Sequence, residues 1–367
     1  MKTCYQAEII QMGKQIEELF KPKPKIYWFD FITTGVLSWS LFLFAIRFPL
    51  NSVLFYLLIC LSAVGFYRML VFTHELAHLK KGSLPGFHFF WHVFCGLPFL
   101  APHFLYKGTH LAHHSKKSFG TIEDGEYFQF GKNSFWLLVL HFLYNFIIPL
   151  ISILRFMFVA IISICHPGLR NFVMKKMSFM GLTFFLTRKL PHQKLEKIIW
   201  YCEEISCTFF CWFIFTLILF DKIPSMVFFQ WYGILVFILT LNSLRAITSH
   251  VYTSSGKAMT FQAQIQDSIT ITSNSIFTKI MCPVGTQYHA LHHMFPSIPY
   301  HALGKAQKFL QTNFPNEAFL STTTSDSLFN TWKMAWNLHI RNKHYTDESG
   351  NFNKKPNSME DWQSEII

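Results

Sequence analysis

The stretch from Gln287 to His301 reads Gln-Tyr-His-Ala-Leu-His-His-Met-Phe-Pro-Ser-Ile-Pro-Tyr-His. Inside it, three histidines at i, i+3 and i+4 share one helical face: His289, His292 and His293. Two earlier clusters repeat this arrangement, one in full and one as a pair a turn apart: His110, His113 and His114, then His74 and His78. Neutral imidazole is the commonest nitrogen ligand for transition metals. Eight imidazoles exceed the four to six ligands of a single ion, so the clusters predict a pair of metals.

The composition is typical of a chain that crosses a membrane several times. Of the 367 residues, 51% are hydrophobic, 14% are charged and 43 are Phe, whereas about a quarter of a soluble chain is charged. The formal charge of +12 does not indicate nucleic-acid binding, because the basic residues form no patch interleaved with aromatic side chains. Basic loops retained on the cytoplasmic side of a membrane explain it better.

Eight cysteines are spread along the chain without a Cys-x-x-Cys pair. We expect buried reduced thiols, which pack like small hydrophobic side chains, and no ligands of zinc or of an iron–sulfur cluster. The N-terminus has no apolar segment of the kind that precedes a cleavage site, so no cleaved signal peptide is expected.

Hydropathy predicts an all-α integral membrane protein, with four transmembrane helices in two hairpins and a cytoplasmic helical cap that carries the histidine clusters. About 20 apolar residues cross a hydrocarbon core of about 30 Å. The four predicted spans are 26–48, 50–72, 200–220 and 224–246. The second and the fourth span continue without a helix breaker, so we expect helix ends at His78 and His250 to project beyond the hydrocarbon.

A further apolar segment, from Phe135 to Cys165, differs from the four predicted spans because polar residues and a proline interrupt it. The interruptions are His141, Asn145, Pro149 and Arg155. A re-entrant or interfacial helical pair accommodates such residues better than one clean span does.

The distribution of basic residues predicts the sidedness. Of the 32 Lys and Arg residues, only Arg47 and Lys222 fall in the turns that join the two helices of each hairpin. Because cytoplasmic loops retain Lys and Arg, both termini and all three histidine clusters are expected on the cytoplasmic side. The chain then divides into an N-terminal cytoplasmic arm (1–25), a membrane domain (26–320) and a cytoplasmic tail (321–367) whose end is expected to be disordered.

The sequence His74-Glu-Leu-Ala-His78 also matches His-Glu-x-x-His, in which two histidines bind zinc and the Glu is the general base of a metalloprotease. A membrane zinc protease is therefore an alternative function. It needs only one further ligand and leaves the other two clusters without a role, so the two-metal interpretation is favoured.

The remaining polar candidates are less specific. Several histidines are interpreted as ordinary interfacial residues with no ligand role: His88, His92, His103, His141, His166 and His192. Four acidic residues either orient ligating imidazoles through the second ring nitrogen or lie in solvated turns, and the sequence leaves both interpretations open. They are Glu123, Asp124, Glu126 and Asp267.

The clusters and their flanks resemble the membrane fatty acid desaturase superfamily, from about Phe66 to Leu310. The matching motifs are one His-x-x-x-His and two His-x-x-His-His boxes, with the flanks Gly120-Thr-Ile-Glu-Asp-Gly-Glu-Tyr127 and Tyr288-His-Ala-Leu-His-His-Met-Phe-Pro296. The resemblance implies two iron ions, which use O₂ and two external electrons to remove two hydrogens from an acyl chain. By this likeness the metal ligands are the eight box histidines: His74, His78, His110, His113, His114, His289, His292 and His293.

A ninth ligand is expected at His250. Relatives carry a further histidine at a helix end a few residues after Asn-Ser, and here Asn242-Ser243 is followed by His250 after a longer gap. A helix that begins at Pro224 would lift His250 about as far past the membrane as the second span lifts His78. The alternative is an ordinary helix-end histidine, whose charge favours the negative end of the helix dipole.

The resemblance also bears on the substrate and the electron source. The first box has three intervening residues, unlike the four typical of acyl-CoA desaturases, so an acyl-lipid or an otherwise activated acyl substrate is as much to be expected as an acyl-CoA. Front-end desaturases usually carry Gln where this chain has His289. No fused haem or flavin domain is visible, so the electrons are expected from a separate ferredoxin or cytochrome b5-like protein, attracted by the basic cytoplasmic face. The same boxes also serve hydroxylation and ketolation of lipids, which the sequence does not separate from desaturation.

Overall fold

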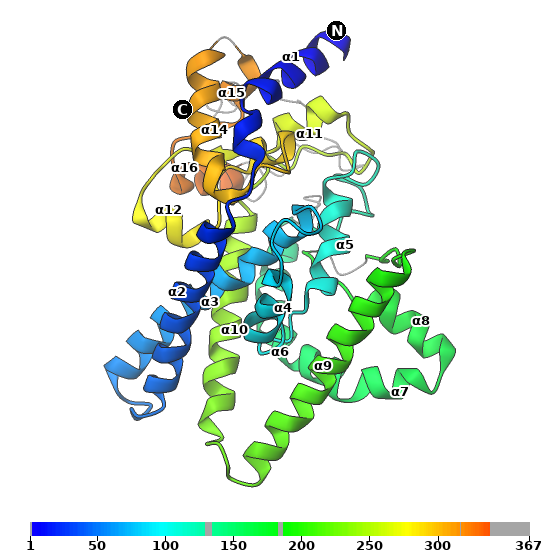
Figure 1. Cartoon of the computed structure of the whole chain (residues 1–367), viewed down its shortest axis with the longest axis vertical. Helices are drawn as coiled ribbons and strands as arrows, with labels where there is room; N and C mark the ends of the chain where they lie inside the picture. Colours follow the sequence, from blue (N-terminus) through cyan, green and yellow to red (C-terminus); the bar gives the residue numbers. More distant parts are fainter. Residues whose placement is uncertain (1, 129–133, 183–185, 316, 338–367) are drawn as a thin grey trace.

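Two antiparallel helical hairpins form the long body of the molecule (Figure 1). The computed structural model describes residues 2–128, 134–182, 186–315 and 317–337. The hairpins are α2 (Pro24–Ala45) with α3 (Val53–His78), and α9 (Lys194–Leu219) with α10 (Met226–Ala246). These helices match the four predicted spans. Pro24 begins α2 at a position where its missing N–H is not needed.

Helix α10 ends earlier than expected. The continuous helix to His250 was wrong, because α10 stops at Ala246. The chain then turns over residues 247–249, and His250 forms an isolated antiparallel bridge with Ser268. A tertiary contact with a later segment, and not helix length, therefore fixes the position of His250.

Five helices in the described part of the chain are long and apolar enough to cross a membrane. The fifth, Trp136–Ile164, lies where we expected a helical pair, so the count of four is not confirmed. It is one continuous run: α6 (Ser134–Leu154), the π-helix η3 (Arg155–Val159) and α7 (Ala160–Ile164). The helix α8 (Pro167–Lys176) follows.

The polar residues that were expected to interrupt this run instead find partners on neighbouring helices. His141 Nε2 and Asn145 Nδ2 lie 2.8 and 2.9 Å from Ser243 Oγ on α10. Arg155 Nη2 donates to Glu204 Oε1 on α9 at 2.8 Å. Pro149 is accommodated inside α6, as neighbouring groups allow in apolar surroundings. Because residues of α9 and α10 pair with these polar groups, the helix continues where a break was expected.

A short helical element connects the first hairpin to the second histidine cluster. It comprises α4 (Phe87–Trp91), the π-helix η2 (His92–Gly96) and, after a turn, α5 (His103–His113). Indole N–H groups satisfy the carbonyls of this turn: Trp39 donates to Phe94 O at 3.2 Å and Trp231 to Pro98 O at 2.8 Å. Irregular backbone in apolar surroundings requires such protein partners.

A helical cap covers one end of the hairpins (Figure 1). Its elements are α1 (Lys2–Gln15), the 3-10 helix η1 (Glu17–Phe20), α11 (Phe261–Asp267), β1 (Thr270–Ile271), α12 (Ile276–Met281), α13 (His289–Met294), α14 (Tyr300–Asn313), α15 (Ala318–Thr322), β2 (Thr324–Ser325) and α16 (Leu328–Ala335). The two strands pair in parallel. Met12 and Ile16 of the N-terminal arm are buried against Leu303 and Leu310 of α14, so the arm is part of the cap.

Two further expectations concern the cysteines and the tail. Cys95, Cys207, Cys211 and Cys282 are buried free thiols as expected, whereas three others are exposed: Cys60, Cys165 and Cys202. The tail is helical over α16. Its end, expected to be disordered, falls in 338–367 and lies outside the described residues.

Candidate metal centre

All nine histidines predicted as ligands converge at the junction of the hairpins and the cap, in two groups. The five-imidazole group comprises His74, His78, His110, His114 and His292. The four-imidazole group comprises His113, His250, His289 and His293. Within each group, one nitrogen from every ring lies within 4.8 Å of one nitrogen from every other ring. The expected ninth residue, His250, is therefore as close to the cluster as the box residues are.

Each His-x-x-His-His box contributes to both groups. At the end of α5, His110 and the following residue, His114, join the five-imidazole group, whereas His113 belongs to the four-imidazole group. On α13 the division is reversed, because only His292 joins the five-imidazole group. The i, i+3, i+4 spacing spreads three rings over an arc of one helical face, so α5 and α13 each bridge the two groups.

The Nε2 atoms of the rings face one another at short range. The Nε2–Nε2 distances are 2.8 Å for His78–His110, 3.2 Å for His114–His292, 2.9 Å for His250–His289, 3.1 Å for His289–His293 and 3.2 Å for His113–His250. Every ring except that of His74 is represented. The ligand nitrogens therefore converge on two points between the rings.

Carboxylates hold the opposite nitrogen of three rings. His113 Nδ1 lies 3.0 Å from both Asp124 oxygens, His110 Nδ1 lies 3.1 Å from Glu126 Oε2, and His250 Nδ1 lies 3.4 Å from Asp267 Oδ2. Such partners fix the tautomer and the orientation of metal-binding imidazoles. Glu123 behaves differently, because it forms an exposed ion pair with Lys189 at 2.6 Å. Three of the four acidic residues therefore lie where they orient imidazoles, whereas Glu123 lies in a solvated turn.

The pKa shifts agree with a nitrogen donor set. Burial holds the pKa of five imidazoles well below its ordinary value: His110, His114, His289, His292 and His293. Burial alone would also lower the pKa of His113, but the Asp124 carboxylate raises it above its ordinary value. Most rings are therefore neutral at pH 7, the form that binds metal.

The residues present fit a pair of transition-metal ions. When Nδ1 of His113 and of His250 donates to a carboxylate, each Nε2 carries a lone pair, and these two lone pairs face each other across 3.2 Å. A cation between them removes the repulsion. A site built from imidazole nitrogens suits iron, zinc, copper or nickel.

The structure also adds residues that we did not predict. Gln264 Nε2 lies 3.2 Å from His293 Nδ1, and Tyr106 Oη lies 3.0 Å from His110 Nδ1. Tyr106 precedes His110 by one helical turn, so the spacing could have revealed it. Gln264 comes from α11 and joins the site only through tertiary packing.

The histidines interpreted as ordinary residues lie outside both groups. Most of them have a polar neighbour: His92 contacts Ser206 at 2.9 Å, His103 contacts Thr73 at 2.9 Å, and His141 contacts Ser243 at 2.8 Å. His88 pairs with Glu203 at 2.9 Å, and His166 caps α8 by accepting from Leu169 N.

The position of Glu75 opposes the zinc protease alternative. Its Oε2 accepts hydrogen bonds from Tyr27 Oη at 2.5 Å and from Tyr300 N at 3.0 Å. Glu75 is 4% exposed and ties α3 to α2 and to the start of α14. A general base must reach the water that it activates, whereas this carboxylate serves as a structural link.

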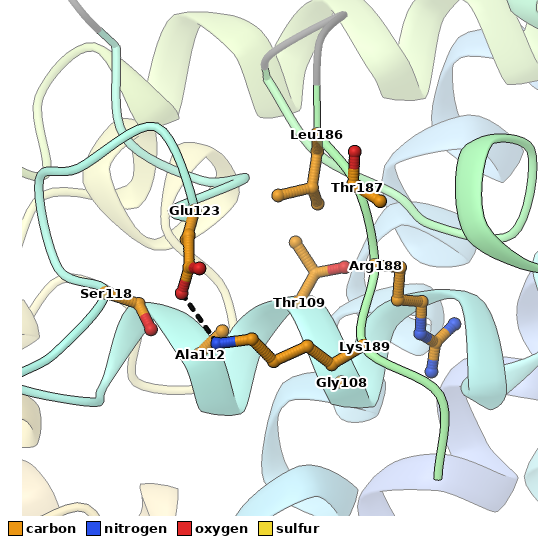
Figure 2. A pocket seen from close by; sticks show the side chains of 9 residues that line it. All are labelled: Gly108, Thr109, Ala112, Ser118, Glu123, Leu186, Thr187, Arg188 and Lys189. Atoms are coloured by element: carbon orange, nitrogen blue, oxygen red, sulfur yellow. Dashed lines mark hydrogen bonds and ion pairs between the residues drawn. The ribbon is translucent and has the colours of Figure 1, made fainter.

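A pocket beside α5 is separate from the metal site (Figure 2). Gly108, Thr109 and Ala112 of α5 line it, and the Lys189–Glu123 ion pair lies across it. Gly108 and Ala112 are on the opposite side of the helix from His110 and His114. None of the nine histidines lines this pocket, so we assign it no part in the chemistry.

Comparison with known proteins identifies the family. The family model for fatty acid desaturases matches residues 49–323, which include all nine histidines. A ceramide hydroxylase from Caulobacter vibrioides (strain NA1000 / CB15N) is 28% identical over 319 residues, which cover 85% of this chain and 88% of that protein. No solved structure matches the chain. Because the family model covers most of the chain, the chain belongs to the fatty acid desaturase family. Its long apolar helices and this family membership make it a multi-pass membrane protein.

Proposed function

We propose that this chain is a membrane-bound, O₂-dependent oxidase that hydroxylates an acyl chain of a ceramide-like lipid at a pair of iron ions. The observation that carries the proposal is the convergence of nine histidines into a five-imidazole and a four-imidazole group. Oxidation of an unactivated C–H bond is beyond side-chain acid–base catalysis. Two bound iron ions would supply the oxidation chemistry, with O₂ as the oxidant. We therefore assign His74, His78, His110, His113, His114, His250, His289, His292 and His293 as the ligands.

The protein's own residues prepare the site for this chemistry. Asp124, Glu126 and Asp267 orient three ligands, and Gln264 orients a fourth. Burial of the four-imidazole group excludes bulk water, which strengthens the electrostatic interactions within the site. The reaction combines substrate C–H, O₂, two electrons and two protons to give C–OH and one water.

Hydroxylation is preferred to desaturation because the relative that matches over most of its length is a ceramide hydroxylase. Desaturation of an acyl-lipid remains the second candidate, since the family model is that of fatty acid desaturases. Both reactions need two external electrons. We propose a separate ferredoxin or cytochrome b5-like donor, because the formal charge of +12 would attract an acidic protein. The histidine groups are proposed to lie on the cytoplasmic side, as the basic residues predict.

Product analysis tests the proposal. The chain is expressed in a host that makes ceramides, and lipids are compared by mass spectrometry with those of a host expressing His292→Ala. Growth under ¹⁸O₂ should give a ceramide that has gained one labelled oxygen in its acyl part. A product that has lost two hydrogens without gaining oxygen would assign desaturation instead. Unchanged lipids, from wild-type protein that carries two irons and receives electrons from an added donor, would contradict both activities on this substrate.

A further inference from the structure

The pocket beside α5 contains two buried polar atoms that lack a partner. It is the cavity of about 110 Å³ drawn in Figure 2. Arg188 is 8% exposed, and its Nε atom has no hydrogen-bond partner among the described residues. The same holds for Oγ1 of Thr109, which is 2% exposed. A buried polar group without a partner is costly, so these two atoms indicate that a ligand completes the pocket.

Two contacts position the Arg188 guanidinium, and a glycine leaves room for it. Cζ of Arg188 lies 4.3 Å from the ring centroid of Trp200 on α9, and Nη1 donates to Ser178 O. A Cβ atom at Gly108 would come within 2.8 Å of Nη2 and 3.0 Å of Nε. Gly is unfavourable inside a helix, and here its lack of a side chain lets the guanidinium lie directly against α5. The group is therefore fixed in the wall of the pocket.

The charge of Arg188 is not compensated within the protein. The ion pairs of the described residues do not include this arginine. Burial, with a smaller contribution from the nearby Arg155, lowers the pKa of its guanidinium to about 10, and Glu203 and Glu196 counteract this only in part. A buried charge is costly unless it is paired. The pocket therefore lacks a negative charge.

The carboxylate that lines the pocket is already paired. Glu123 Oε2 accepts from Lys189 Nζ at 2.6 Å. Figure 2 shows segment 186–189 passing beside α5, with the Lys189 side chain stretched across the pocket to Glu123. Because the charges of Glu123 and Lys189 cancel, Arg188 leaves the pocket with a net positive charge.

The surrounding segment is basic and lies close to the start of a membrane helix. Residues 166–197 contain seven Lys and Arg residues and a single acidic residue, Glu196. Helix α9, which is long and apolar enough to cross a membrane, begins at Lys194, five residues after Lys189. The pocket therefore lies near the level at which α9 leaves the hydrocarbon, where the headgroups of lipids are found.

We propose that this pocket binds a phosphate group, carried by the headgroup of an anionic lipid or by a soluble phosphate compound. Arginine binds phosphate through directed N–H donors, and the hydroxyl-bearing residues Ser118, Thr109 and Thr187 line the same pocket. A phosphate offers more acceptor oxygens than a carboxylate does, so it suits this number of donors. A cavity needs only about 10–15 Å³ to hold one water, so this one admits a group of several atoms.

A bound phosphate would join two parts of the fold. Thr109 belongs to α5 and directly precedes His110 of the second box, whereas Arg188 belongs to the segment that leads into α9. A ligand held by both would fix α5, and with it the second box, against that segment. None of the nine histidines lines the pocket, so this site is separate from the metal centre and goes beyond the proposed oxidation.

The test measures ligand binding to the full, iron-loaded chain in a non-ionic detergent and a phosphate-free buffer. The phosphorus retained per chain is determined first. Thermal unfolding is then followed while dihexanoyl phosphatidic acid or inorganic phosphate is titrated, with dihexanoyl glycerol as the control lipid that lacks phosphate. The wild-type chain should retain phosphorus or unfold at a higher temperature with a phosphate-bearing probe. Stabilisation by inorganic phosphate as well as by the lipid assigns the pocket to the phosphate group itself, whereas stabilisation by the lipid alone assigns it to a headgroup.

Three variants locate the binding. Arg188→Gln should weaken it by roughly 10- to 150-fold, the loss expected for hydrogen bonds to a charged group. Thr109→Val replaces an unpartnered hydroxyl by a methyl group, so the free protein should be at least as stable as wild type, yet its binding should fall by about 2- to 10-fold. Lys197→Gln removes an exposed charge of the same segment outside the pocket and should bind as wild type does.

Absence of retained phosphorus together with absence of stabilisation by either probe would overturn the proposal. Equal binding by wild type, Arg188→Gln and Thr109→Val would also overturn it, because the phosphate would then bind elsewhere on the basic surface. Neither measurement uses the oxidation product, so failure of this proposal and failure of the proposed hydroxylation are distinguishable.

Discussion

The two imidazole groups differ in ligand number and in what lies behind the ligands. The four-imidazole group is fully buried, and Asp124 and Asp267, each at most 1% exposed, contact two of its rings. The five-imidazole group includes the half-buried rings of His78 and His114. Among the described residues, one carboxylate lies within hydrogen-bond distance of an Nδ1 atom of this group, that of Glu126 beside His110. The four-imidazole group thus has fewer ligands and more negative charge behind them. We therefore expect metal binding in this group to be the more sensitive to the loss of any one ligand or carboxylate.

The largest effect is expected from His250→Ala. Removal of one of four imidazoles should release the metal of that group, abolish product and lower the iron content from about two toward about one per chain. That loss exceeds the roughly 10- to 100-fold cost of removing a residue that only orients a ligand. Product analysis and metal analysis of the membrane-inserted protein check it.

The matched variants for this prediction come from outside and from within the site. His141→Ala removes a buried histidine that contacts Ser243 and belongs to neither imidazole group, and it should retain iron and activity. His292→Ala removes one of five ligands and should retain more iron than His250→Ala does. Full iron and full activity in His250→Ala would show that eight histidines are sufficient.

An intermediate effect is expected from Asp124→Asn and Asp267→Asn. Each substitution keeps the shape of the side chain and removes the charge behind one ring of the four-imidazole group. Metal affinity should fall by about 10- to 100-fold, measured as iron retained against increasing chelator. Glu123→Gln is the control, since its ion pair with Lys189 is exposed. Equal iron retention in Glu123→Gln and Asp124→Asn would show that the carboxylates behind the four-imidazole group do not distinguish it from the five-imidazole group.

The smallest effect is expected from Glu75→Gln. The amide oxygen of Gln can still accept from Tyr27 or from Tyr300 N, so the link between α3 and α14 is weakened but not lost. Activity should fall by much less than the 100-fold or more that removal of a general base costs. A loss of that size, with iron content unchanged, would give Glu75 a direct role in the reaction.

Local spacing predicted much of this site, because ligands at i, i+3 and i+4 need only helical geometry to share a face. It could not predict which group each ring joins, since that depends on how α5, α13 and α3 pack. Gln264 was missed for the same reason. His250 was identified although its helix ends at Ala246, and a bridge to Ser268 holds it instead.

The hairpin predictions show the same limit. Four spans followed from runs of apolar residues, and the structure contains all of them as helices. Arg155 and His141 indicated a broken segment because their partners, Glu204 and Ser243, lie 49 and 102 residues away in the chain. Sequence patterns register the polar residue but not the distant group that satisfies it.

The most direct test of the two-metal account is the metal content of the purified chain, prepared without chelators and without oxygen. Elemental analysis should give about two irons per chain, and Mössbauer spectroscopy should resolve two iron environments, because a five-imidazole and a four-imidazole site differ in coordination. One tightly bound zinc per chain, with no iron and with catalytic loss in Glu75→Gln, would contradict the account and support a zinc protease.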